Sequence, residues 1–322
     1  MPALTGCAMV ETIVRDCWCG AARAEAIGRF DLPFSHDLVR CEGCGVLGLW
    51  PQPNDQELEA SYYSREYYGH SRQKFVGPIA AFIGYFQHAR ARLIQRRVPR
   101  GSRILDVGCG NGGFLRSLVP RGYQGEATEW TSFSAARVGV DPPFVVHVGD
   151  LLDLDLPDER YDAVTLWHVF EHLRRPDATL ERIHRLLKPE GRLFLSMPNA
   201  ESWQAQHFGI HWLHHDPPRH MFEFGPRSLA ILAKLHGFRI DRLTTVSLEQ
   251  NLFGYIQSWL NARGYPRDLA YDILKRVARV SPTTRMKQLS LVTLLVLPGL
   301  VETIISDCAR RGATMTVELV KA

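Results

Sequence analysis

The stretch that decides the fold is RILDVGCGNGGFL, residues Arg103–Leu115. It begins with a short apolar run, which predicts a buried strand, and passes through a glycine-rich turn into a helix with apolar residues at helical spacing. Gly108, Gly110 and Gly112 let the backbone turn tightly and let a ligand approach, because no Cβ is in the way. Asp106 at the strand end disfavours a phosphate ligand, since like charges repel, and favours a cationic one.

Strand and helix patterns alternate after this stretch. The expected strands span residues 123–130, 144–150, 161–168, 192–199, 239–247 and 313–321, with helices between them that include 177–188. This alternation predicts an α/β fold in which helices cover both faces of a largely parallel sheet.

The D-x-G-x-G motif at a strand end resembles the first motif of the class I S-adenosylmethionine (SAM) methyltransferases, and later positions keep the register of that family. The resemblance implies a Rossmann-like, seven-stranded sheet that binds SAM. It assigns the methionine end to Asp106 and the turn, the ribose hydroxyls to Glu129, and the adenine to residues after the second and third strands. The residues so assigned are Tyr68, Asp106, Gly108, Cys109, Gly110, Glu129, Trp130, Asp150, Leu151 and His168.

Composition places the chain among ordinary soluble globular proteins. It has 322 residues, of which 45% are hydrophobic and 22% charged, with a formal net charge of +4. That charge is too small to imply nucleic acid by itself. A basic start followed by an apolar run is not seen at the N-terminus, so we expect a cytoplasmic protein. Seven cysteines in a reducing compartment indicate metal binding or free thiols rather than disulfides.

Four of the cysteines form two close pairs near the N-terminus. Cys41 and Cys44 have the C-x-x-C-G spacing of a zinc knuckle, whereas Cys17 and Cys19 are one residue closer together than in a standard knuckle. The pattern predicts a structural Zn²⁺ held by all four thiolates. The alternative is a metal-free ribbon.

The patterns divide the chain into five parts. They are a zinc-ribbon-like segment at 1–54, a helical lead-in at 55–100, the SAM-binding core at 101–248, a helical insertion at 249–312 and a final core strand at 313–322. The front end resembles methyltransferases of bacterial glycan and natural-product pathways. That resemblance implies that the lead-in covers the cofactor, with Tyr68 reaching its methionine end; the alternative for Tyr68 is helix packing.

His168, Glu171 and His172 follow the fourth strand as H-x-x-E-H. The pattern resembles the E-V-x-E-H of ubiquinone-pathway O-methyltransferases, with His168 in place of the first glutamate. One interpretation is a divalent metal site. The other places His168 beside SAM, with Glu171 and His172 at a helix start facing the acceptor.

A histidine-rich segment at 203–224 follows the fifth strand. Part of it resembles the P-x-H segment that closes the acceptor pocket in the family. A neutral imidazole is a suitable base for an acceptor hydroxyl near pH 7. We predict His220 as that base, with His215 second. The alternative is that these histidines lie outside the site and that positioning alone suffices.

An apolar run at 289–301 lies in the insertion between basic residues, with Arg279, Arg285 and Lys287 before it and Arg310 and Arg311 after it. It is shorter than the roughly 20 residues of a membrane span, and Pro298-Gly299 is expected to interrupt a helix. Three roles stay open: a buried helix, peripheral contact with a membrane, or a homodimer face.

We therefore expect a SAM-dependent methyltransferase that acts on a small-molecule, lipid or glycan acceptor, with oxygen as the expected acceptor atom and no nucleic-acid partner. One alternative is an rRNA or tRNA methyltransferase with a zinc module, for which the basic region 90–103 is the only supporting feature. Another is a non-catalytic SAM-binding regulator.

Overall fold

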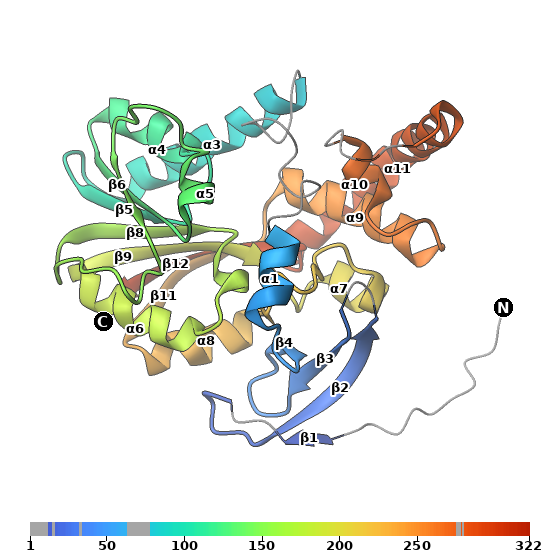
Figure 1. Cartoon of the computed structure of the whole chain (residues 1–322), viewed down its shortest axis with the longest axis horizontal. Coiled ribbons are helices and arrows are strands. Elements are labelled where there is room, and N and C mark those ends of the chain that lie inside the picture. Colours follow the sequence, from blue (N-terminus) through green and yellow to red (C-terminus); the bar gives the residue numbers. More distant parts are fainter. Residues whose placement is uncertain (1–11, 15–16, 32–33, 63–77, 275–277, 279) are drawn as a thin grey trace.

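The computed structural model describes residues 12–14, 17–31, 34–62, 78–274, 278 and 280–322. Two sheets organise this part of the chain (Figure 1). The larger has seven strands in the order β11-β12-β9-β8-β5-β6-β7, and the smaller has five in the order β1-β2-β3-β4-β10.

The larger sheet is the predicted core, and its elements lie close to the predicted ranges. The strands are β5 (Arg103–Val107), β6 (Gln124–Glu129), β7 (Val145–Val148), β8 (Tyr161–Trp167), β9 (Leu187–Pro198), β11 (Phe238–Thr244) and β12 (Thr314–Lys321). Six of them run in the same direction, whereas β12 is antiparallel to both of its neighbours, β9 and β11. This topology confirms the Rossmann-like fold.

Helices cover both faces of this sheet, as Figure 1 shows. The helices α3 (Pro78–Arg97) and α4 (Gly113–Leu118) bury Ile94 and Leu115 on one face. On the other face, α6 (Pro176–Leu186) and α8 (Pro226–Leu235) bury Ile183 and Leu232. Strands that are apolar on both sides therefore lie in a closed three-layer core.

The smaller sheet is formed mainly by the N-terminal segment. Its strands are β1 (Thr12–Val14), β2 (Arg23–Phe30), β3 (His36–Cys41), β4 (Leu47–Trp50) and β10 (Phe222–Glu223). The last of these comes from the histidine-rich segment, and it pairs with β4 through Phe222↔Gly48 and Glu223↔Leu47. Because this strand begins two residues after His220, the N-terminal sheet forms part of the wall beside the histidines.

The cysteine region packs directly on the core. The Trp18 ring lies 5.1 Å from Phe222 and 5.9 Å from Phe224, and Phe224 in turn lies 5.0 Å from Phe170. Helix α1 (Asp55–Tyr62) buries Leu58 in the same cluster, and Asp55 accepts a 2.7 Å hydrogen bond from Arg174. Tyr68 lies outside the described residues.

The insertion contains α9 (Leu248–Ala262), α10 (Leu269–Leu274) and α11 (Pro282–Cys308). The expectation that Pro298-Gly299 interrupts a helix was wrong, because α11 continues through both residues. Pro298 is on the exposed side, whereas Gly299 is buried where Leu252 of α9 comes close; a Cβ on Gly299 would lie 2.8 Å from Leu252 Cδ1. Helix-helix packing therefore compensates for the hydrogen bond that proline cannot donate.

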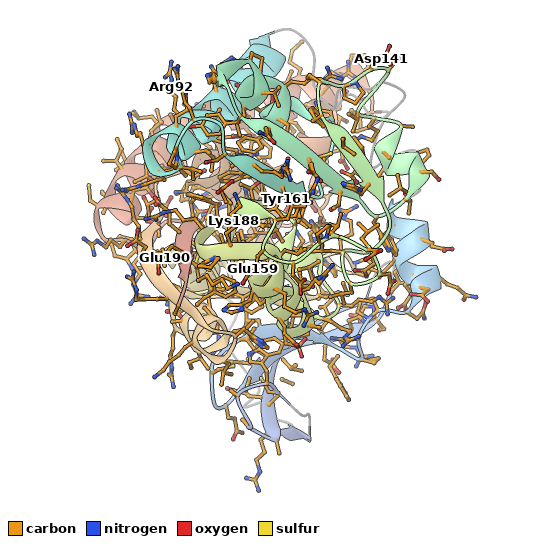
Figure 2. The ribbon with its side chains drawn as sticks, turned by 90° about the vertical axis from the view of Figure 1, so that its left-hand side faces the viewer. Arg92, Asp141, Glu159, Tyr161, Lys188 and Glu190 are labelled. Carbon is orange, nitrogen blue, oxygen red and sulfur yellow. The ribbon has the colours of Figure 1, made fainter. Side chains whose placement is uncertain are left out.

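Figure 2 faces the amino ends of the parallel strands, where Tyr161, Lys188 and Glu159 lie near one another. A shallow pocket of about 390 Å³ opens here. Its charged side chains largely neutralise one another: Lys188 lies 2.7 Å from Asp162, and Arg160 lies 2.7 Å from Glu126. Ligands of open α/β sheets bind at the opposite, carboxyl ends of the strands.

Candidate functional site

The glycine turn after β5 has the shape that the sequence predicts. Gly108 and Gly110 have φ angles of 69° and 63°, in the left-handed region that favours glycine. A Cβ on Gly108 would lie 2.7 Å from Val169 Cγ2, so this residue also allows close packing against the β8 end. At Gly110 a Cβ would meet no heavy atom of the described residues within 4 Å. Packing against Val169 therefore fixes the turn at Gly108, while the backbone at Gly110 is open to a ligand.

Two buried carboxylates lie at this turn. Asp106 accepts a 2.7 Å hydrogen bond from the Thr165 hydroxyl, and Glu129 accepts one from the Gly110 N–H. Burial raises the pKa of Asp106 to about 7, although the Thr165 hydrogen bond and the Arg90 charge act in the opposite direction. Burial also raises the pKa of Glu129, against the Gly110 hydrogen bond. Both groups would gain from a ligand that donates hydrogen bonds or carries positive charge.

Arg90 belongs to this site, which sequence reasoning missed. Its guanidinium interacts electrostatically with Asp106 and Glu249 and lies 5.2 Å from the Trp167 ring centroid. Arg97 of the same helix likewise points inward, to Glu318 at 2.9 Å, whereas Arg92 points outward in Figure 2. The basic side chains of α3 are thus divided between the core and the solvent-exposed face of the helix.

The other residues assigned to SAM lie along the carboxyl ends of β6 and β7. Trp130 directly follows Glu129, and its side chain is 49% exposed. Asp150 is exposed, and its carboxylate accepts a 2.9 Å hydrogen bond from the Leu152 N–H. The Leu151 side chain is buried in the core, so only its backbone is available to a ligand. Cys109 lies in the turn and is half-buried.

Together these residues fit SAM. A buried carboxylate at the methionine end suits its ammonium group, and a second one beside the turn suits a pair of ribose hydroxyls. The open space above Gly110 leaves room for a ligand against the backbone.

A cluster of histidines surrounds Glu171 beside this turn. His168 adopts a left-handed conformation after β8, and its Nδ1 lies 3.3 Å from Glu171 Oε1. His172 ends the short helix η2 (Phe170–His172), and its ring centroid is 4.6 Å from that of His220. The structure thus brings His168, Glu171, His172 and His220 together.

The two facing imidazoles are oriented by backbone carbonyls. His172 Nδ1 is 2.9 Å from Arg219 O, and His220 Nδ1 is 2.7 Å from His214 O. If each Nδ1 donates to its carbonyl, each Nε2 carries the lone pair. Burial lowers the pKa of both imidazoles, to about 4 for His172, although the Glu171 carboxylate opposes this. His220 is therefore held neutral and able to accept a proton.

Glu171 is buried, and its carboxylate oxygens accept no hydrogen bond within the described residues, although Oε1 lies 3.3 Å from His168 Nδ1. Burial raises its pKa, against the influence of His172 and His220. One ligand atom from each of Glu171, His172 and His220 lies within 4.8 Å of the others, so this group also has the spacing to hold a metal ion.

His215, the second predicted base, has a different environment. Its Nδ1 lies 2.7 Å from Glu223 Oε1 on β10, and its ring contacts Phe30 of the N-terminal sheet. His214 is the histidine that sequence reasoning missed: it is buried, burial lowers its pKa to about 3, and its carbonyl orients His220. Among the predicted bases, the structure places His220 rather than His215 beside Glu171.

The four cysteines also come together. Cys17 Sγ is 3.7 Å from Cys44 Sγ, Cys19 Sγ is 3.5 Å from Cys41 Sγ, and all four sulfurs lie within 4.8 Å of one another. Sulfurs at the corners of a tetrahedron around Zn²⁺, each about 2.3 Å from the ion, are about 3.8 Å apart. The tight first pair, C-x-C, therefore does not prevent a tetrahedral donor set.

Comparison with known proteins identifies methyltransferases as relatives of this chain. A family model described as a methyltransferase domain matches residues 81–243. Ubiquinone biosynthesis O-methyltransferase of Pseudomonas entomophila is 30% identical over 118 residues, 34% of this chain and 50% of that protein. The enzyme of the same name from Xanthomonas oryzae pv. oryzae is 37% identical over 105 residues, 31% of this chain and 44% of that protein. The chain thus spans about half the length of these relatives.

Solved structures share the fold at low identity. A protein of Galdieria sulphuraria, assigned as a sarcosine dimethylglycine methyltransferase, has a TM-score of 0.51 and 15% identity, covering 82% of this chain and 98% of that one. Phosphoethanolamine N-methyltransferase 2 of Haemonchus contortus, solved with S-adenosylhomocysteine, has a TM-score of 0.50 and 17% identity, covering 85% and 61%.

The packing under the turn predicts the effect of a methyl group at Gly108. Gly122 is the control, because it has a φ of 90° but, within the described part of the chain, no heavy atom near the position of a Cβ. Gly122→Ala should lower the free energy of unfolding by about 1–2 kcal/mol through backbone strain alone. Gly108→Ala should cost roughly a further 1–3 kcal/mol, because its Cβ overlaps Val169. Adding Val169→Ala to Gly108→Ala should recover that further loss of stability, as measured by urea unfolding. If Gly108→Ala and Gly122→Ala lost the same stability, the packing of Gly108 against Val169 would be contradicted.

Proposed function

Because the chain belongs to the methyltransferase domain family and is a class I SAM-dependent methyltransferase, we propose that it methylates a hydroxyl oxygen of a small-molecule, lipid or glycan acceptor. The observation that carries this proposal is the position of His220, whose imidazole lies beside Glu171 and His172, with one ligand atom of each residue within 4.8 Å of the others. The O-methyltransferase relatives support oxygen as the acceptor atom.

Asp106 and the Gly108–Gly110 backbone would hold the methionine end of SAM, and Glu129 the ribose. Trp130, Asp150 and the Leu151 backbone would border the adenine. When bound, SAM supplies a methyl group activated by a sulfonium. The chain's own task is then to bind, to orient the acceptor, to exclude water and to remove one proton.

Asp106 predicts the pH dependence of SAM affinity. Its pKa is raised to about 7, so the carboxylate becomes protonated as the pH falls, and a cationic ligand then loses its partner. SAM affinity should fall by about tenfold between pH 7.5 and pH 6.0, as measured by calorimetry. Asp106→Asn should bind weakly with little change over that range.

Asp158→Asn is the matched control, since Asp158 lies at the amino-end pocket. It should keep both the affinity and the pH dependence. Native-like SAM affinity in Asp106→Asn would contradict the role given to this carboxylate.

His220 would remove the acceptor proton through Nε2. Its Nδ1 contact with His214 O fixes the ring, and the Glu171 and Asp216 carboxylates favour its protonated form. Although burial opposes ionisation, Arg219 and His220 keep the pKa of Asp216 below its usual range, so this group stays charged. The imidazolium formed in the reaction is thus stabilised by two nearby carboxyl groups.

The role of His220 as a base predicts that His220→Asn lowers kcat by about 10²–10⁴ while SAM affinity hardly changes. Because burial lowers the pKa of His220, the rising limb of the wild-type pH–rate profile should lie below the ordinary histidine pKa, and it should disappear in the variant. His211→Asn, an exposed histidine of the same segment, should retain full activity.

Two outcomes would overturn this role. A His220→Asn enzyme with most of its activity would leave His220 as a positioning residue. A wild-type activity that requires added Mg²⁺ would assign Glu171, His172 and His220 to a metal ion instead.

The cysteine cluster would hold a structural Zn²⁺ through Cys17, Cys19, Cys41 and Cys44. Sulfur spacings of 3.5 and 3.7 Å support this assignment. Cys44 packs in the same apolar cluster as Phe222 and Phe224, which follow His220. The ion would therefore stabilise the wall beside the base.

This assignment predicts about one zinc per purified chain by mass spectrometry. Cys44→Ser should lose most of the metal, lower Tm, and reduce kcat by roughly tenfold to a hundredfold, because displacing a positioned group is costly. Cys308→Ser, at an exposed cysteine on α11, should leave metal content, Tm and kcat unchanged. A fully active, metal-free wild type would rule out the zinc.

A further inference from the structure

Helix α11 exposes large apolar side chains and buries several polar ones, although Leu295 is also buried. Its buried positions include the polar residues Gln288, Thr303 and Ser306. Its exposed positions carry large apolar side chains, with Leu294 73% and Leu297 71% exposed. A surface helix normally buries its apolar stripe and exposes its polar face. Of the three roles left open for residues 289–301, a buried helix does not fit these exposed apolar side chains.

Hydrogen bonds fix this orientation. Glu302 accepts a 2.7 Å hydrogen bond from Gln204 Nε2, and Asp307 accepts a 2.8 Å hydrogen bond from Asn251 Nδ2 on α9. Turning the helix to bury its apolar residues would break both and leave buried polar groups unpaired. The apolar face is thus held outward by the fold itself.

The exposed face is a continuous stripe. We define the α11 stripe by its exposed apolar residues: Met286, Leu289, Leu294, Leu297, Val301, Ile304 and Ile305. These positions extend over about 30 Å at 1.5 Å per residue. An adjoining groove of about 820 Å³ between α7 (Trp203–Phe208), α9 and α11 shares Leu297 and Val301 with the stripe and adds Phe208 and Tyr255. Unpartnered apolar surfaces of this extent mark interaction sites.

The charges around the stripe have one sign. Within residues 281–311, all of which the structure describes, the exposed charged residues are Arg285, Lys287, Arg310 and Arg311. They lie at the two ends of the helix, with the apolar stripe between them. This arrangement of an apolar face flanked by basic residues suits the surface of an anionic bilayer.

We propose that α11 docks this chain on an anionic lipid surface, lying in the plane of the membrane with its stripe among the headgroups and upper acyl chains. Within the described part of the chain, α11 is long and apolar enough to cross a membrane by length and composition. However, Leu291 and Leu295 pack against Leu252 and Ile256 of α9, so lipid cannot surround the helix in this fold. A helix that lies in the plane of the membrane agrees with both its apolar composition and its packing against α9.

A second copy of the chain fits less well. In a two-fold antiparallel pair of α11 helices, Arg285 and Lys287 would meet the Arg310 and Arg311 of the copy. In a parallel pair each basic end would meet itself. Both arrangements bring like charges together, whereas lipid phosphates neutralise them.

The test is flotation of the full chain with vesicles of phosphatidylcholine alone or with 30% phosphatidylglycerol, without SAM. The chain should partition at least about tenfold more strongly to the anionic vesicles. Leu294→Glu/Ile304→Glu should abolish flotation and keep the far-UV circular dichroism, because both side chains are exposed. Val140→Glu/Val246→Glu, matched in chemistry and exposure but outside the stripe, should float like wild type.

Arg285→Gln/Lys287→Gln should lose most of the preference for anionic vesicles and keep the circular dichroism spectrum. Absence of wild-type flotation, or unchanged flotation of Leu294→Glu/Ile304→Glu, would overturn the proposal. A dimer in light scattering that the same two substitutions dissociate, without vesicle binding, would assign the stripe to a second copy. Vesicle-bound protein that resists alkaline carbonate would indicate a spanning helix. None of these readouts depends on methyl transfer.

Discussion

The pairing of β10 with β4 is the constraint on which the acceptor side of this protein depends. Two residues, Phe222 and Glu223, join a sheet formed more than 170 positions earlier in the chain. The backbone between them and α7 must therefore pass between the N-terminal sheet and the core, and it carries His214 and His220 with it. Because Glu223 also binds His215, the same short strand separates the two predicted bases: His215 faces the N-terminal sheet and His220 faces Glu171.

Local patterns predicted the core well, and they failed where distant segments meet. The glycine turn and the carboxylates Asp106 and Glu129 follow from residues adjacent in sequence, whose spacing fixes their place at strand ends. A two-residue strand such as β10 has no periodicity, so its partner β4 cannot be inferred. The role of Arg90 beside Asp106 could not be predicted, because a helical pattern shows which residues share a face, but not which buried carboxylate lies opposite.

The insertion shows a second limit of sequence patterns. Pro298 and Gly299 indicate a helix break when only local propensity is considered. In the fold, Gly299 allows α9 to approach, and the packing of the two helices outweighs the lost hydrogen bond. Hydrophobicity alone likewise suggested burial of residues 289–301. The polar partners Gln204 and Asn251, far away in sequence, decide which face of α11 is buried.

Asn251 connects the insertion to the core so closely that the two should move as one body. Its side-chain amide donates to Thr245 O and to Asp307, while its side-chain oxygen accepts from the Thr314 N–H at the start of β12. On the next turn of the same helix, a Cβ on Gly254 would lie 3.0 Å from both Gln204 and His214. Helix α9 therefore contacts both Gln204, which lines the groove beside α11, and the histidine that orients His220. A surface that holds α11 would also fix the direction in which the acceptor side faces.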